Sequence, residues 1–254
     1  MSVFVIAEAG VNHGGRLDHA AALIDGAREA GADAVKFQLF SAKKLGRDEL
    51  LPLELDYEAI TRLHENCKGI EFLCTPFDVE ALSFLVKLGV RRVKIASGCL
   101  ENRDLLYATY RTGLPVILST GMSDLTRIKN ALDLLAGNVT LLHCVSSYPC
   151  ALNHANLNAM DTLRARFRRP VGYSDHTEGI LAALAATAKN AVIIEKHLTL
   201  DRHASGPDHR SSIEPKTFAK MVRQIRAVES ALGNGEKRVM ACEEKTRKIW
   251  SPTA

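Results

Sequence analysis

The sequence lacks any apolar run that approaches the length of a membrane span, and it lacks a strong excess of one charge. The formal net charge is only +4 over 254 residues, which favours anionic small molecules and is far from a nucleic-acid-binding profile. A strand pattern begins at Val3, so no signal peptide is expected. We therefore expect a cytoplasmic protein with neither nucleic-acid nor membrane partners.

The six cysteines lack CxxC spacing, and the chain lacks low-complexity segments, charge blocks and linkers. Cys74 and Cys144 lie inside apolar, strand-like runs, which indicates reduced core residues of a cytosolic protein. With no composition shift to mark a boundary, residues 1–254 are predicted to form one domain.

Strand and helix patterns alternate regularly along the chain. Strands are predicted at 3–8, 34–38, 71–76, 92–97, 115–120, 139–146, 170–176 and 192–199. Helices are predicted at 18–30, 57–66, 79–88, 104–112, 126–135, 157–167, 179–189 and 215–232. Eight strands, each followed by a helix, predict an α/β fold of the (β/α)8 TIM-barrel type. A doubly wound open sheet is less favoured, because it would normally show fewer strands and a glycine-rich first turn.

The most informative stretch runs from Ala191 to Ser212 and reads AVIIEKHLTLDRHASGPDHRSS. It opens with the apolar run 192–194, typical of a strand buried on both faces. Because side chains alternate along a strand, Glu195 and His197 point the same way at its end. A buried carboxylate and imidazole are costly unless they meet a partner, a metal or a substrate.

An earlier strand repeats this pattern. In the stretch 171–176, Ser174 and His176 share a face, just as Glu195 and His197 do. The two histidines, on adjacent strands, could hold a divalent metal with positions left open for water and substrate.

A barrel should carry its functional residues at the carboxyl ends of its strands, and polar residues stand at nearly all of these ends. Two interior lysines and four hydroxyls are Lys36, Lys94, Thr75, Ser97, Ser119 and Ser174. They form a set suited to a phosphate or a carboxylate. Glu8 and Glu195 would then serve as acid–base or cation-stabilising groups.

Each of these residues also has an ordinary structural explanation. A lone strand-end lysine usually extends to solvent, a lone serine usually caps the next helix, and a lone histidine usually lies satisfied in the core. The convergence of polar residues on eight strand ends favours a site over eight separate coincidences.

Taken together, these residues and their surrounding motifs resemble the sialic acid synthase family. The family includes N-acetylneuraminate, legionaminate and pseudaminate synthases and spore-coat-polysaccharide relatives. The matching motifs, in family order, are AEAGVNHGG, KFQ, CTPFD, KIASG, ILSTGM, LLHCVSSYP, GYSDHT, EKHLT and GPDHRSS. Together they cover the chain from Val3 to about Lys248, and nine motifs in register are highly specific.

The resemblance implies a metal-dependent condensation of phosphoenolpyruvate with an open-chain amino sugar aldehyde such as N-acetylmannosamine. The product would be a 2-keto-3-deoxy sugar acid, with release of phosphate. By resemblance, His176 and His197 bind the metal, with Mn2+ expected first and Mg2+ or Co2+ as alternatives. Phosphoenolpyruvate would be held by Lys36, Thr75, Lys94, Ser97, Ser119, Ser146 and Ser174. Glu8, Glu195 and Asp208 would be catalytic, and Gln38, Tyr148 and Asp208 would contact the sugar.

Three departures from the family concern the acceptor side. Relatives usually continue into a small antifreeze-like domain that covers the partner's active site with an arginine, and here that domain is expected to be absent. The segment between Gln38 and Thr75 looks shorter than in the sialic acid enzymes. Ser146 stands where those enzymes tend to have asparagine. We therefore expect a homodimer or a separate lid-domain protein as candidate partners, and the acceptor sugar stays open.

Two alternatives remain open at this point. One is a class I aldolase that forms a Schiff base at Lys94 or Lys36. The other is a non-catalytic barrel subunit that acts with a partner, although the intact set of ionisable residues argues against it.

Overall fold

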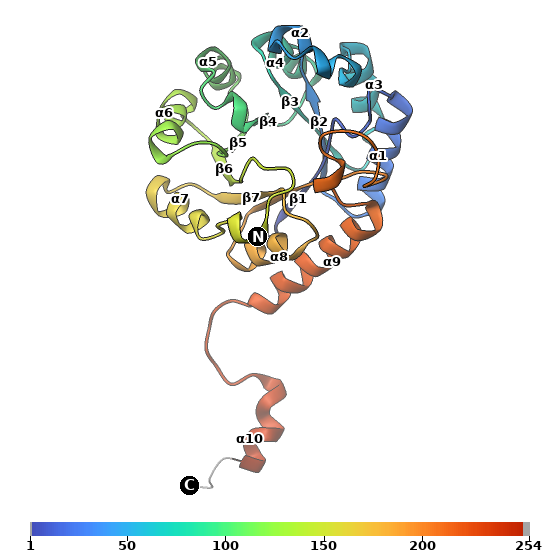
Figure 1. The fold of residues 1–254 in the computed structure, drawn as a ribbon. Coiled ribbons are helices and arrows are strands. Elements are labelled where there is room, and N and C mark those ends of the chain that lie inside the picture. The colour runs from blue at the N-terminus through green and yellow to red at the C-terminus, as the bar shows by residue number, and fades with distance from the viewer. Residues whose placement is uncertain (1, 251–254) are drawn as a thin grey trace.

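Eight parallel strands curve into a barrel in the computed structural model, which describes residues 2–250 (Figure 1). The strands are β1 (Phe4–Gly10), β2 (Ala34–Leu39), β3 (Glu71–Pro76), β4 (Val93–Ile95), β5 (Val116–Ser119), β6 (Val139–His143), β7 (Val171–Asp175) and β8 (Ile193–His197). The hydrogen-bonded order is β3-β2-β1-β8-β7-β6-β5-β4, and β3 lies against β4 to complete the ring. The predicted (β/α)8 fold is confirmed.

Each predicted helix is present within a few residues of its expected bounds. These helices are α1 (Leu17–Glu29), α3 (Tyr57–Asn66), α4 (Val79–Leu88), α5 (Arg103–Thr112), α6 (Leu125–Leu135), α7 (Ala159–Phe167), α8 (Leu181–Ala188) and α9 (Pro215–Leu232). Short polar side chains define several of the starts: Asp56, Asp78, Asn102 and Asp124 each accept a bond from a backbone N–H of the first turn. The helices surround the barrel on its outer side (Figure 1).

Several short elements were not predicted. They are α2 (Ala42–Leu45), η1 (Asp48–Leu53), η2 (Ser97–Cys99), η3 (Leu152–His154), η4 (His209–Ser211), η5 (Ala241–Glu243) and α10 (Glu244–Trp250). A single turn has too few residues to show a periodic pattern, so the sequence carries no clear signal for it. After α9 the chain leaves the barrel, and α10 lies apart from it (Figure 1).

Several strand predictions were too long, three of them by three residues. The strand predicted at 92–97 ends at Ile95, because Ser97 already begins η2. The strand predicted at 139–146 ends at His143. The strand predicted from 192 begins at Ile193, and Val192, expected to be buried, is 37% exposed. Apolar character at a strand end does not by itself separate the last paired residue from the loop.

The barrel interior has an apolar floor. One inward-facing cluster consists of Ile6, Ala34, Leu73, Ile117, Leu142 and Ile193. Packing here is tight: a Cβ on Gly172 would lie 2.5 Å from the Ile193 carbonyl oxygen and 2.7 Å from Leu142 Cδ2. A larger apolar core fills the space between the outer face of the sheet and the helices. The polar inward-facing residues therefore lie above this floor, toward the carboxyl ends of the strands.

Within the described residues, no helix is both long enough and apolar enough to cross a membrane. All six cysteines are free, and four of them, Cys74, Cys99, Cys144 and Cys150, are buried.

A buried ion pair joins β7 and β8 on their outward face. Lys196 Nζ lies 3.0 Å from Asp175 Oδ2, and neither side chain is exposed. The other Asp175 oxygen accepts bonds from the backbone N–H and the hydroxyl of Thr177, both at 2.8 Å. Because neighbours on a strand alternate in direction, this pair stands directly behind His176 and His197.

Breaking this pair should destabilise the barrel strongly. Replacing Asp175 with Asn leaves the Lys196 charge buried without its counter-charge, a change that typically costs about 3–5 kcal/mol. We expect a loss of that size in the free energy of unfolding measured with urea. Lys129→Met is the matched control, because it breaks an exposed pair with Asp133 and such pairs contribute little. Equal effects for the two substitutions would contradict this account.

Candidate active site

A cavity of about 680 Å3 opens at the carboxyl ends of the strands. Its walls include every site residue predicted from the sequence. These are Glu8, Lys36, Gln38, Thr75, Lys94, Ser97, Ser119, Ser146, Tyr148, Ser174, His176, Glu195, His197 and Asp208. The structure therefore brings all of them together, while their individual roles stay predictions.

Four ionisable side chains form a buried cluster directly above the apolar floor. Lys36 Nζ lies 2.5 Å from Glu8 Oε2 and 3.8 Å from Glu195 Oε2. Lys94 Nζ lies 3.6 Å from Glu195 Oε1. Each of the four is less than 6% exposed. Two lysines and two glutamates thus compensate one another in a dry environment.

The surroundings move the pKa values of this cluster in different directions. Burial acts to lower the pKa of Lys36, but attraction to Glu195 and Glu8 outweighs it and raises the pKa. For Lys94 burial prevails, and the pKa is lowered despite the nearby Glu195. Burial acts to raise the pKa of Glu195, yet the two lysines hold that pKa below its usual range. Glu195 is therefore a carboxylate at neutral pH.

Hydroxyls and one amide complete the inner wall. Lys94 donates to Ser119 Oγ at 2.8 Å, and Lys36 donates to Thr75 Oγ1 at 3.3 Å. Ser174 donates to Glu195 Oε1 at 3.0 Å. Gln38 Nε2 donates to Glu8 Oε1 at 2.9 Å. The lysine charges are thereby fixed in direction as well as in position.

A polar part of the cavity wall consists of Lys94, Ser97, Cys144 and Ser146 and packs against Gly121. Neither Cys144 nor Gly121 was predicted as a site residue. The Gly121 N–H donates to Ser97 Oγ at 3.0 Å, and Ser97 Oγ lies 3.3 Å from Cys144 Sγ. A Cβ on Gly121 would lie 2.4 Å from Ser146 Oγ and 3.0 Å from both Cys144 Sγ and Ser97 Oγ, so only glycine lets these side chains pack against the backbone here. Ser146 Oγ is buried and has no hydrogen-bond partner. A cavity wall that combines hydroxyls with a lysine suits an oxyanion such as phosphate.

The cavity also involves residues that were not predicted, and the sequence carried a usable signal for only some of them. Gly121 directly follows Ser119 and Thr120 at a strand end, so its position was available from the sequence. Leu45, Arg47 and Leu50 also line the cavity, but they come from the segment of α2 and η1, for which the sequence predicted no element.

The two histidines lie next to one another at the ends of the neighbouring strands β7 and β8. The centroids of the two imidazole rings are 5.5 Å apart. The centroid of the Tyr148 ring lies 4.2 Å from that of His176 and 5.8 Å from that of His197. His176 Nδ1 is 2.7 Å from the Val145 carbonyl oxygen, and since a carbonyl only accepts, Nδ1 carries the hydrogen. Burial lowers the pKa of His176 to about 3. His176 is therefore neutral at neutral pH, with an unprotonated Nε2.

His197 has a carboxylate neighbour. Its Nδ1 lies 3.5 Å from Asp208 Oδ2 but forms no hydrogen bond, and this nitrogen is buried without a bonding partner. Groups of three or more His, Cys, Asp and Glu side chains arranged for a metal ion are absent from residues 2–250. Any metal at this place would rest on the two imidazoles, with the remaining positions open.

The turn that follows β1 borders the site and contains a buried histidine. His13 is 1% exposed, and its Nδ1 accepts the N–H of Gly15 at 3.0 Å. A Cβ on Gly15 would lie 2.1 Å from the Pro52 carbonyl oxygen, and its φ is +74°, so the turn needs glycine there. Burial lowers the pKa of His13 to about 4.

This lowered pKa should make stability depend on pH. Between pH 6.5 and 4 the unfolded chain protonates His13 and the folded chain does not, so stability falls as the pH falls through this range. One such group contributes a slope of up to about 1.4 kcal/mol per pH unit. His13→Asn keeps an acceptor for Gly15 but does not titrate, so its unfolding free energy should fall less steeply. Urea titrations at several pH values measure both slopes, and identical slopes would contradict the prediction.

Comparisons with known proteins agree with this geometry. The model of the NeuB family matches residues 23–237. The N,N'-diacetyllegionaminic acid synthase of Legionella pneumophila is 42% identical over 94% of this chain and 75% of its own length. The human N-acetylneuraminate-9-phosphate synthase is 35% identical over 94% of this chain and 74% of its own length.

Solved structures give the same result. The N-acetylneuraminic acid synthetase of Leptospira borgpetersenii superimposes with a TM-score of 0.91 at 41% identity, covering 98% of this chain and 91% of that one. A truncated 3-deoxy-D-arabino-heptulosonate 7-phosphate synthase of Thermotoga maritima, at 17% identity and a TM-score of 0.73, shares the fold.

Proposed function

This chain belongs to the NeuB family, and on that premise we propose that it condenses phosphoenolpyruvate with an open-chain amino sugar aldehyde such as N-acetylmannosamine. The products are a 2-keto-3-deoxy sugar acid of the sialic acid type and inorganic phosphate. The buried cluster of Lys36, Lys94, Glu8 and Glu195 at the base of the cavity is the observation that carries this proposal.

The arrangement of the inner wall supports the placement of phosphoenolpyruvate. Lys94, Ser97 and Ser146 line one part of the cavity, and their ammonium and hydroxyl groups suit a phosphate. Lys36, whose pKa is raised, provides an ammonium for the carboxylate at neutral pH. Both anionic ends of this small molecule are then held, and its methylene carbon is left to face the open side of the cavity.

The two glutamates suit the charge that develops in this reaction. The methylene carbon attacks the aldehyde carbon, a carbon–carbon bond forms, and the phosphate-bearing carbon becomes electron-deficient. The carboxylate of Glu195, kept ionised by two lysines, stabilises that positive centre, with Glu8 beside it. Water then adds at this carbon, and the carbon–oxygen bond to phosphate breaks to give the ketone.

The residues present fit a divalent metal ion, with Mn2+ proposed. His176 Nε2 is unprotonated because Nδ1 is bound to the Val145 carbonyl, and such a backbone contact fixes a ligand histidine in one tautomer. His197 Nδ1 is buried and without a hydrogen-bond partner. A metal held by these two side chains would supply Lewis-acid polarisation of the sugar aldehyde.

The acceptor is proposed to lie between the histidines and the mouth of the cavity. Tyr148 covers both imidazole rings and is 46% exposed. Gln38 and Asp208 reach the same region from β2 and from the loop after β8. The Asp208 carboxylate is in place to accept the proton of a sugar hydroxyl.

Phosphate release provides the direct test. We expect release from phosphoenolpyruvate with Mn2+ only when a suitable aldose is present, and complete loss of release with EDTA. The panel contains N-acetylmannosamine, its 6-phosphate and bacillosamine-derived hexoses. Absence of release together with absence of phosphoenolpyruvate binding in calorimetry would refute the synthase proposal and favour the non-catalytic subunit.

The class I aldolase alternative is tested separately. Lys36 stays protonated and is therefore a poor Schiff-base nucleophile, whereas burial lowers the pKa of Lys94. Borohydride treatment with pyruvate should leave the mass of the protein unchanged if the synthase proposal is right. A reduced adduct at Lys94 would establish the aldolase instead.

Lys94 should be needed for the affinity for phosphoenolpyruvate. Lys94→Met removes a buried ammonium that lines the cavity, and charge-assisted hydrogen bonds of this kind contribute about 1.5–3 kcal/mol. We expect the dissociation constant, measured by calorimetry, to rise about 10- to 100-fold. Lys129→Met on the far, exposed face of α6 is the control and should bind as the wild type does. Unchanged affinity in Lys94→Met would remove this residue from the binding site.

A further inference from the structure

The loop between β8 and α9 carries Asp208 at the point where it returns to the barrel. Residues 203–207 are exposed, whereas 211–213 are buried. Among the described residues, the Asp208 carboxylate forms one ion-pair contact, the 3.5 Å approach to His197 Nδ1. With so little holding the side chain directly, the position of the carboxylate depends on what holds the backbone at residue 208.

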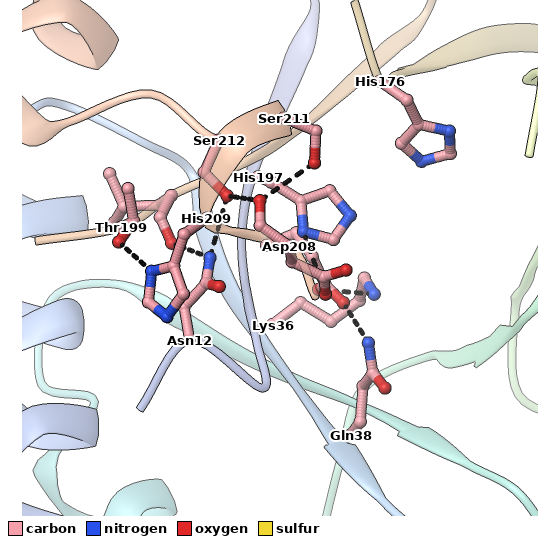
Figure 2. A network of polar contacts seen from close by, with 12 residues as sticks. Asn12, Lys36, Gln38, His176, His197, Thr199, Asp208, His209, Ser211 and Ser212 are labelled. Atoms are coloured by element: carbon pink, nitrogen blue, oxygen red, sulfur yellow. Dashed lines mark hydrogen bonds and ion pairs between the residues drawn. The ribbon is translucent and has the colours of Figure 1, made fainter. Parts of the chain in front are cut away.

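Two hydroxyls hold that backbone. Ser211 Oγ donates to the Asp208 carbonyl oxygen at 2.9 Å, and Ser212 Oγ donates to the same oxygen at 2.6 Å (Figure 2). Ser211 and Ser212 are each 1% exposed, so water does not compete for these bonds.

Ser212 is in turn fixed by Asn12 from the turn after β1. Asn12 Nδ2 donates to Ser212 Oγ and to the Leu198 carbonyl oxygen, both at 2.8 Å. An amide nitrogen only donates, so the single hydroxyl hydrogen of Ser212 must point to Asp208. The chain of bonds from Asn12 through Ser212 to Asp208 therefore has one possible direction (Figure 2).

The strand that carries His197 anchors the same segment. The Ile213 N–H donates to the His197 carbonyl oxygen at 3.0 Å, and the Thr199 N–H donates to the Ile213 carbonyl oxygen at 3.1 Å. On the other flank, His209 Nδ1 lies 2.7 Å from Thr199 Oγ1. The end of β8 and the returning arm of the loop are thus tied together around residue 208.

We propose that Asn12 and Ser212 are positioning residues, which hold the Asp208 carboxylate at its working distance from His197. This inference rests on the proposed function, since it concerns how Asp208 is presented to the acceptor. Neither residue lines the cavity, so they act through Asp208 and not by contact with substrate. Small displacements of a reacting group reduce rates steeply, and a shift of about 1 Å can cost 100-fold.

The variants Ser212→Ala and Asn12→Ala test the inference. We expect turnover with the acceptor to fall about 10- to 100-fold, while the dissociation constant for phosphoenolpyruvate changes less than about twofold. Thr109→Ala is the matched control, because Thr109 also donates a buried hydroxyl to a backbone carbonyl, at 2.7 Å, but in α5. The control should lose stability and keep its turnover. If Ser212→Ala does not fold, Ser211→Ala removes the other donor to the same carbonyl.

A double-mutant cycle separates positioning from a general structural effect. If Ser212 acts through Asp208, adding Ser212→Ala to Asp208→Asn should change turnover less than about twofold. If Ser212→Ala reduced turnover by the same factor in the wild-type protein and in Asp208→Asn, the inference would be overturned. The proposed function would still stand in that case, because the wild-type protein would be active.

A crystal structure of Ser212→Ala provides a readout that is independent of activity. We expect the Asp208 carboxylate to have moved away from His197. A carboxylate still at 3.5 Å from His197 Nδ1 would overturn the inference whether or not the wild type turns over. Absence of wild-type turnover with a displaced Asp208 would instead point to failure of the proposed function.

Discussion

The buried cluster of two lysines and two glutamates is the constraint on which the rest of the site depends. Charges that are buried to this extent are tolerated only when they compensate one another. Lys36 lies between Glu8 and Glu195 and provides that compensation. The apolar floor below excludes water from one side, and the tight packing at Gly172 keeps the strands at this spacing. The barrel thereby keeps an ionised carboxylate and an ammonium ready at the base of an open cavity.

Alternation along the strands divides chemistry from support. On β7 and β8, Ser174 and Glu195 point into the cavity, while Asp175 and Lys196 point outward and form a fully buried pair. The two histidines extend from the same strand ends, so their separation follows from the spacing of two neighbouring strands. Loops then add the remaining residues, and Asp208 reaches the histidines because its loop folds back onto the end of β8.

The repeated strand-and-helix pattern was sufficient to predict the barrel, because each of its periods is a local property of the chain. It was also sufficient to predict that Lys36, Lys94 and Glu195 converge, since strand ends meet at one rim of any parallel barrel. Strand ends were placed less well, as at Ser97 and Val192, because hydrogen-bond pairing and not hydrophobicity ends a strand. The short turns of α2 and η1, which bring Arg47 to the cavity, have no periodic signal to be found.

The sequence by itself determined the fold class, the family resemblance and which side chains stand at the carboxyl ends of the strands. Only the tertiary structure decided which of them touch: that Lys36 pairs with Glu8, that His176 binds the Val145 carbonyl, and that Asn12 reaches Ser212 across 200 residues of chain. Contacts between residues so distant in sequence form only when the barrel closes. A local sequence pattern does not specify the individual distances that result from this closure.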